Sequence, residues 1–201
     1  MTERLMLILF LAPLTAGALS LIVRRSRVAE YVTVLAAITD LVVSFLLLRY
    51  ALEQRHTFLH NYILLDNLGA WVILCVSIVY TLASIYAVGY MRLLDEDERL
   101  PLFYALFSGF AFTMLGACVM NNVGVFWIAI ELTTLISTFL VGFEREAEST
   151  EAAWKYIVVV SAGISLALLG TVLFYWGGSY VLGPSYAMTL SLIHISEPTR
   201  P

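Results

Sequence analysis

The chain has 201 residues, of which 61% are hydrophobic and 13% are charged, and its mean hydropathy is +0.89. Soluble domains carry about a quarter charged residues, so this composition excludes an ordinary soluble protein and indicates a membrane protein. The formal net charge of -4 gives no basic surface for nucleic acid.

Six apolar stretches are long enough to cross a bilayer, for which a helix needs about 20 residues. We therefore predict an all-α, polytopic transmembrane helix bundle with spans at Leu5–Val23, Val28–Tyr50, Leu68–Tyr90, Leu102–Met120, Val123–Phe143 and Ala152–Tyr175. Pro101 predicts the start of the fourth helix, and Gly177–Gly178 predicts the end of the sixth.

The first span could be a signal peptide, because Ala16-Gly17-Ala18 resembles a cleavage site. Its positive cluster, Arg24, Arg25 and Arg27, follows the apolar run instead of preceding it. We therefore expect a helix that is retained in the mature protein.

The side of the membrane on which Lys and Arg lie predicts the orientation. The first, third and fifth loops hold Arg24, Arg25, Arg27, Arg92, Arg99 and Arg145, whereas the N-terminus and even loops hold Arg4, Arg49 and Arg55. Six against three predicts cytoplasmic odd loops and an external N-terminus.

The last residues differ from everything before them. LSLIHISEPTR, Leu190 to Arg200, resembles a translated sequencing adapter, and the next adapter base would open a proline codon that matches Pro201. We expect residues 190–201 to be such an artefact, which excludes His194, Glu197 and Arg200 from any site. The natural protein is then expected to continue beyond Thr189.

Glu131 is the only charged side chain between Val123 and Phe143. A charge at a helix centre costs about 2.5 to 3.5 kcal/mol on insertion scales. The twelve Val, Ile, Leu and Phe residues of this span favour insertion by roughly 4 to 7 kcal/mol in total. The helix can therefore insert, and Glu131 should face protein or water.

Thr134 and Thr138 follow Glu131 at i+3 and i+7, so a polar stripe is predicted on one helical face. Low dielectric favours the neutral carboxyl and a nearby cation favours the carboxylate. This balance suits a proton relay. The structural alternative is a protonated Glu131 that is hydrogen-bonded to a neighbouring helix.

Lys155, the only lysine, lies near the start of the sixth span. It could instead extend to the cytoplasmic interface, as long basic side chains do. Glu131 should lie about 18 Å below the cytoplasmic end of its helix and Lys155 about 5 Å below that end of its own. A direct ion pair would need bent helices or bridging water, so a hydrated chain is the simpler prediction.

Two further carboxylates are candidates. Asp40 lies in the middle of the second span, where a role in helix packing and a role in a proton path are equally compatible with the pattern. Asp66 precedes the third span, and helix capping alone accounts for it.

Other reactive residue types form no motif. His56 and His60 lack further metal ligands at suitable spacing, and Cys75 and Cys118 are predicted to be small buried hydrophobes. Gly163, Ala167 and Gly170 predict a helix face suited to close packing. No cofactor, metal site or catalytic residue is therefore expected.

Three stretches resemble the antiporter-like subunits of respiratory complex I: DNLGAWVILCVSIVYTLASIYAVGYMR, NNVGVFWIAIELTTLISTFLVGF and STEAAWKYIVVVSAGISLALLGTVLFY. IELTT followed by EAAWKY is most similar to the hydrogenase-4 component F branch. The likeness covers residues 66–175 well and the first two spans loosely. We accordingly expect residues 1–65 to form two N-terminal helices and residues 66–189 a truncated antiporter-like region.

The resemblance implies a subunit of fourteen or so helices, of which six are present, built from two inverted repeats. It matches Glu131 to a glutamate on the fifth helix and Lys155 to a lysine on the sixth, in a hydrated chain that carries protons. Asp40 matches no motif of the family. The implied partners are other membrane subunits, and indirectly soluble nickel-iron hydrogenase or iron-sulfur subunits.

Three functions follow from this interpretation. The first is a proton- or sodium-translocating subunit of a hydrogenase or complex I-like oxidoreductase that carries no redox centre itself. The second is a structural membrane anchor that moves no ions. The third is a subunit of a multisubunit cation/proton antiporter that is independent of redox chemistry.

Overall fold

The computed structural model describes residues 2–52, 56–58, 62–93, 99–144 and 146–182. Six long apolar helices, α1 (Thr2–Val23), α2 (Ser26–Ala51), α3 (Asn67–Leu93), α4 (Leu100–Ala117), α5 (Val123–Val141) and α6 (Ala147–Leu182), carry the predicted spans. The predicted all-α class of multi-pass bundle is confirmed, and each span lies in the expected helix apart from the ends of α4 and α5.

A short hairpin joins α2 to α3 and was not predicted. Its strands, β1 (His56–Phe58) and β2 (Ile63–Leu65), are antiparallel, with His56 opposite Leu65. Leu64 N donates to the carbonyl of Val119 at 2.9 Å, and Asn121 N donates to that of Tyr62 at 2.8 Å. Because these residues pair with the hairpin, α4 ends at Ala117 and not at Met120 as predicted.

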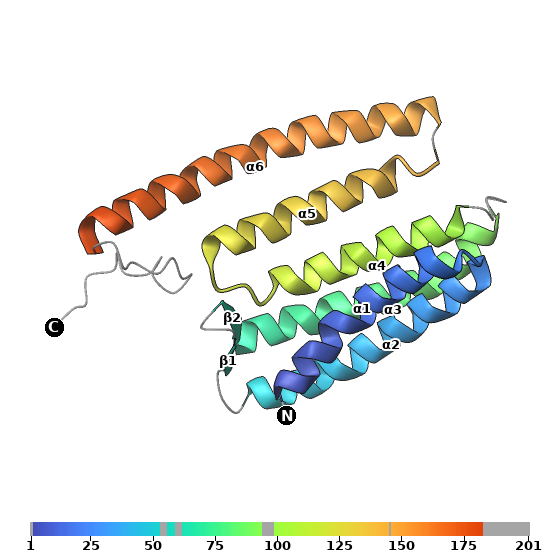
Figure 1. Ribbon diagram of the computed structural model, residues 1–201, viewed down its shortest axis with the longest axis horizontal. Helices are drawn as coiled ribbons and strands as arrows, with labels where there is room; N and C mark the ends of the chain where they lie inside the picture. Colours follow the sequence, from blue (N-terminus) through green and yellow to red (C-terminus); the bar gives the residue numbers. More distant parts are fainter. Residues whose placement is uncertain (1, 53–55, 59–61, 94–98, 145, 183–201) are drawn as a thin grey trace.

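The helices form a bundle with two additional layers (Figure 1). Helix α1 packs on α2 and α4, and α2 packs on α3, so that α1 to α4 enclose one core. Helix α5 then lies on α4, and α6 lies on α5 as the outermost helix. Of the described side chains of α6, none is buried.

The apolar core is divided along the bundle. One cluster lies at the hairpin end and includes Leu9, Leu47, Leu65 and Leu115. Another lies at the opposite end. It comprises Ala29, Ala87, Met91, Leu100, Tyr104 and Phe143. Between them the cluster of buried apolar residues is small, because buried polar side chains occupy the inner faces there.

One expectation about the glycines of α6 is wrong. The helix continues through Gly177 and Gly178 to Leu182. Intrahelical hydrogen bonds satisfy the backbone in an apolar environment, so glycine is a weak helix stop there. The predicted close-packing face stays a prediction, because no described residue would lie within 4 Å of a Cβ atom at Gly163 or Gly170.

Candidate functional site

The start of α5 determines where Glu131 lies. The side chain of Asn122 caps the helix, because its Oδ1 accepts hydrogen bonds from Gly124 N at 3.0 Å and Val125 N at 3.2 Å. Glu131 is therefore about 12 Å along the helix from its first residue, Val123. This depth places the carboxyl well inside the apolar layer.

One face of α5 carries the polar side chains and is directed toward α6. Trp127, Glu131, Thr134 and Thr138 share this face by helical spacing. Trp127 Nε1 donates to the carbonyl of Ile164 in α6 at 2.9 Å. The polar stripe predicted at Glu131 thus faces a neighbouring helix.

The carboxyl of Glu131 is half-buried, and its Oε2 atom is buried with no hydrogen-bond partner among the described residues. Both threonines are buried, and each donates its hydroxyl hydrogen to the carbonyl four residues earlier on α5, at 3.1 Å for Thr134 and 2.8 Å for Thr138. Their oxygen lone pairs remain able to accept a hydrogen bond.

Lys155 does not contact Glu131. It lies exposed on α6 and forms an ion pair with Glu151, one helical turn earlier. Lys155 lies in the segment of α6 that faces Thr138, because Ala153, Trp154 and Thr138 line one cavity. Thr138 is about 10 Å along α5 from Glu131. The structure therefore separates the two residues along the helix axes, as the depth argument predicted.

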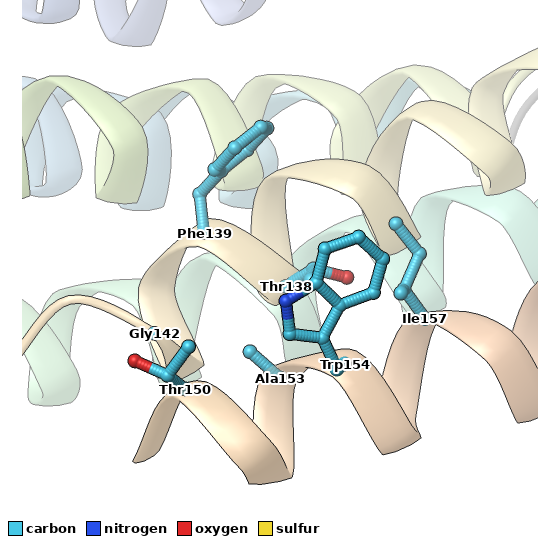
Figure 2. A pocket seen from close by; sticks show the side chains of 7 residues that line it. All are labelled: Thr138, Phe139, Gly142, Thr150, Ala153, Trp154 and Ile157. Atoms are coloured by element: carbon cyan, nitrogen blue, oxygen red, sulfur yellow. The ribbon is translucent and has the colours of Figure 1, made fainter. Parts of the chain in front are cut away.

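The cavity between α5 and α6 has a volume of about 420 Å³. Its lining is mainly apolar, and Figure 2 shows the Trp154 indole extending from α6 toward Thr138 on α5. The residues around it are Thr138, Phe139, Gly142, Thr150, Ala153, Trp154 and Ile157. The cavity lies on the Lys155 side of Glu131, and neither of these two residues is among those that line it.

Asp40 lies in a different part of the fold. It is fully buried on α2, and neither carboxylate oxygen has a hydrogen-bond partner in the described part of the chain. Helix α2 packs on α1, α3 and α4, whereas α5 packs on α4 and α6. Asp40 and Glu131 thus belong to separate sites on either side of α4.

Asp66 acts at the start of α3. Its Oδ1 accepts a hydrogen bond from Gly69 N at 2.7 Å, which satisfies one donor of the first helical turn. A Cβ atom at Gly69 would lie 2.9 Å from that oxygen and 3.1 Å from the carbonyl oxygen of Cys118. Asp66 therefore has a structural partner that accounts for its position.

Sequence reasoning missed an ion pair at the end of the bundle opposite the hairpin. Arg92 on α3 donates from Nη2 to Glu30 Oε2 at 2.5 Å and from Nε to Oε1 at 3.3 Å. Glu30 is buried on α2. The available signal was a charged residue inside the second predicted span.

The remaining reactive residues form no cluster. The described residues contain no group of three His, Cys, Asp or Glu side chains that could hold a metal ion. His56 lies in β1, and His60 lies outside the described residues. Cys75 and Cys118 are both free, but Cys75 is exposed on α3, contrary to the prediction, because its side chain lies on the outer face of the helix.

Comparison with known proteins gives concordant matches. Residues 120–193 match the family described as NADH:quinone oxidoreductase/Mrp antiporter, transmembrane. A hydrogenase-4 component F homolog from Methylacidiphilum infernorum is 31% identical over 132 residues, which cover 63% of this chain and 28% of that protein. These matches support the resemblance of this chain to antiporter-like membrane subunits.

Two further likenesses extend the comparison. Na(+)/H(+) antiporter subunit A1 of Staphylococcus aureus is 35% identical over 104 residues, covering 51% of this chain and 13% of that protein. A chain in the structure of the membrane-bound sulfane sulfur reductase, an archaeal respiratory membrane complex, superposes with a TM-score of 0.73 at 17% identity. That superposition covers 89% of this chain and 37% of the other, and shows the shared fold.

The predicted resemblance to antiporter-like subunits, including the hydrogenase-4 component F branch, is confirmed. The antiporter-like chain spans about a quarter of the length of the hydrogenase-4 relative that it matches. The described residues form six helices that are long and apolar enough to cross a membrane, and the similarity to complex I-like and Mrp antiporter subunits is consistent with ion translocation.

Proposed function

We propose that the chain forms part of a proton-translocating subunit of a hydrogenase-4-like or complex I-like oxidoreductase in a bacterial or archaeal cytoplasmic membrane. The observation that carries this proposal is the half-buried carboxyl of Glu131, whose Oε2 atom has no partner among the described residues. A structural carboxyl in an apolar layer is expected to be hydrogen-bonded, whereas a relay group must be free to exchange its partner.

Glu131 takes up and releases the proton in this mechanism. The lone pairs of Thr134 and Thr138 accept hydrogen bonds from water or from a hydronium ion along the same face of α5. Lys155 lies further along the path, where its positive charge favours the carboxylate form of groups that come near it. Electron transfer in other subunits changes these charge interactions, and the Glu131–Lys155 path responds by moving a proton.

The partners in this proposal are other membrane subunits and, indirectly, soluble nickel-iron hydrogenase or iron-sulfur subunits. The N-terminus lies outside, so the Glu30–Arg92 end of the bundle faces the cytoplasm. The similarity to a Na(+)/H(+) antiporter subunit supports a second candidate, a cation/proton antiporter that works without electron transfer.

The test replaces Glu131 by Gln in the complete subunit within its membrane complex. Proton uptake into vesicles is followed with a pH-sensitive dye after addition of the electron donor. We expect transport to fall while assembly of the complex, measured by native electrophoresis, is retained. The matched control is Glu148→Gln, in the first turn of α6, which is exposed and should transport as the unmodified protein does.

Unchanged transport by Glu131→Gln would contradict the relay and favour a structural anchor. Sodium-driven proton movement in the absence of an electron donor, lost in the same variant, would favour the antiporter candidate. If Glu131→Gln loses the proton transport that the electron donor drives, and no sodium-driven movement is found, the result supports the oxidoreductase.

A further inference from the structure

A second set of buried polar groups lies inside the bundle of α1 to α4, away from Glu131. The polar side chains that are fully shielded from solvent here occupy the inner faces of α2, α3 and α4. They are Thr33, Asp40, Ser44, Ser77, Ser84 and Ser108. The apolar clusters lie mainly at the two ends of the bundle, so this polar set occupies its middle.

Hydroxyl groups connect the three helices. Ser108 Oγ on α4 lies 3.4 Å from Thr33 Oγ1 on α2. Tyr80 Oη on α3 donates to the same Ser108 oxygen at 3.3 Å. Ser108 therefore joins α2 to α3 in a short chain of groups that both donate and accept, which is what proton transfer along hydroxyls needs.

Asp40 lies near one end of this chain, because Ala37, three residues earlier on α2, packs against Tyr80. Its carboxyl is completely buried, and neither oxygen has a partner among the described residues. Ser77 Oγ on α3 is likewise buried and unpartnered. An ionised carboxylate without a partner costs several kcal/mol in such surroundings, so the carboxyl holds its proton at rest.

The other end of the chain leads toward the Glu30–Arg92 ion pair. Glu30 lies about 15 Å from Asp40 along α2, on the same inner face. Tyr104 of α4 is buried in the same cluster as Ala29, the neighbour of Glu30, and its Oη has no hydrogen-bond partner among the described residues. Arg92 is half-exposed, so the pair is in contact with the outside of the bundle.

We propose that Asp40 is a second proton-binding site, reached from the Glu30–Arg92 end through Tyr104, Thr33, Ser108 and Tyr80, and separated from the Glu131 site by α4. Among the described residues, the ionisable group that faces Asp40 from a neighbouring helix is Tyr80 of α3, and Tyr104 of α4 lies nearer to Glu30. Helix α1 contributes none, because its acidic and basic residues, Glu3 and Arg4, are exposed. A single carboxyl among hydroxyls provides one negative charge, which suits a proton.

This proposal rests on the proposed function only for its contribution to transport. Whether the Asp40 carboxyl carries a proton is measured separately, by infrared spectroscopy of the purified complex. The difference between the unmodified protein and Asp40→Asn should contain the carbonyl band of a protonated carboxyl. Asp66→Asn, at the exposed end of α3, is the matched control and should leave that band in place.

The exchange of the Asp40 proton with solvent is measured by the rate at which the same band shifts in deuterium oxide. Ser108→Ala and Tyr80→Phe interrupt the hydroxyl chain while leaving Asp40 in place, and each should slow the shift several-fold. Ser165→Ala, on the exposed face of α6, is the control for an unrelated hydroxyl and should leave the rate unchanged.

Absence of the band would overturn the proposal, as would its displacement by sodium, which would indicate a cation site. A band whose exchange rate is unaffected by both hydroxyl variants would overturn the path. Glu131→Gln should leave band and exchange unchanged, so failure of Glu131 as a relay is distinguishable from failure of Asp40 as a proton site. If Asp40→Asn does not assemble, Asp40→Glu, which keeps a carboxyl, assigns the band by displacing it, and a spectrum identical to that of the unmodified protein would overturn the proposal.

Discussion

Arg92 and Glu30 form a two-point ion pair that joins the end of α3 to the beginning of α2. Glu30 is almost completely shielded from solvent, whereas Arg92 is half-exposed. The arginine therefore partners a carboxylate that has no access to water of its own. Removing one member of such a pair leaves the other charge without compensation.

Arg92→Ala should lower the unfolding temperature of the subunit in detergent, because Glu30 would be left buried without its cation. Arg92→Lys should lower it less, since a lysine retains the charge but not the two-point geometry. Exposed Arg49→Ala is the control and should have little effect. Equal unfolding temperatures for Arg92→Ala and Arg49→Ala would show that the pair contributes no stability.

Gly69→Ala should destabilise the start of α3. Its Cβ would lie 2.9 Å from Asp66 Oδ1 and 3.1 Å from the Cys118 carbonyl oxygen, so the cap or the following segment must move. Overpacking of this kind costs about 1–3 kcal/mol.

The matched control for that variant is Gly89→Ala on the same helix, where a Cβ atom would meet nothing within 4 Å. Alanine in a helix interior is favoured over glycine by about 0.5–1 kcal/mol, so this change should be neutral or stabilising. Thermal unfolding of both variants measures the contrast, and a similar loss in each would contradict the close contact at Gly69.

Gly142→Cys combined with Ala153→Cys should form a disulfide between α5 and α6. A Cβ atom at Gly142 would lie 3.3 Å from that of Ala153, close to the separation of about 3.5–4.5 Å in disulfides. The variant is made with Cys75 and Cys118 replaced by Ser, and free thiols are counted by maleimide labelling after mild oxidation.

Gly142→Cys with Gly163→Cys is the control for cross-linking, because a Cβ atom at Gly163 would meet nothing within 4 Å. Its thiols should remain available for labelling. Complete labelling of the Gly142–Ala153 pair would contradict the contact between these two helices, and with it the position of the cavity at Thr138.

Lys155→Ala should separate stability from transport. The pair with Glu151 is exposed on one helix, and such pairs contribute about 0.5 kcal/mol or less. The unfolding temperature should therefore hardly change, while proton transport by the complete complex should fall. Transport at the unmodified rate would identify Lys155 as a basic residue that only extends to the membrane surface.

Much of this protein follows from its sequence alone. Hydropathy determines the six helices, because a segment of about 20 apolar residues in a bilayer can satisfy its backbone only as a helix. Glu131 and Asp40, which lie near the middle of two of those runs, are conspicuous for the same reason. The capping role of Asp66 is likewise a local matter of a carboxylate next to free backbone amides.

The tertiary structure decided which of these residues share a site. Helical spacing put Thr134 and Thr138 on the face of Glu131, but it could not show that α6 covers that face or that α4 separates it from Asp40. The partner of Glu30 lies 62 residues away, and Ser108 meets Thr33 across 75 residues. Contacts across such separations depend on how whole helices pack, which no local pattern of residues encodes.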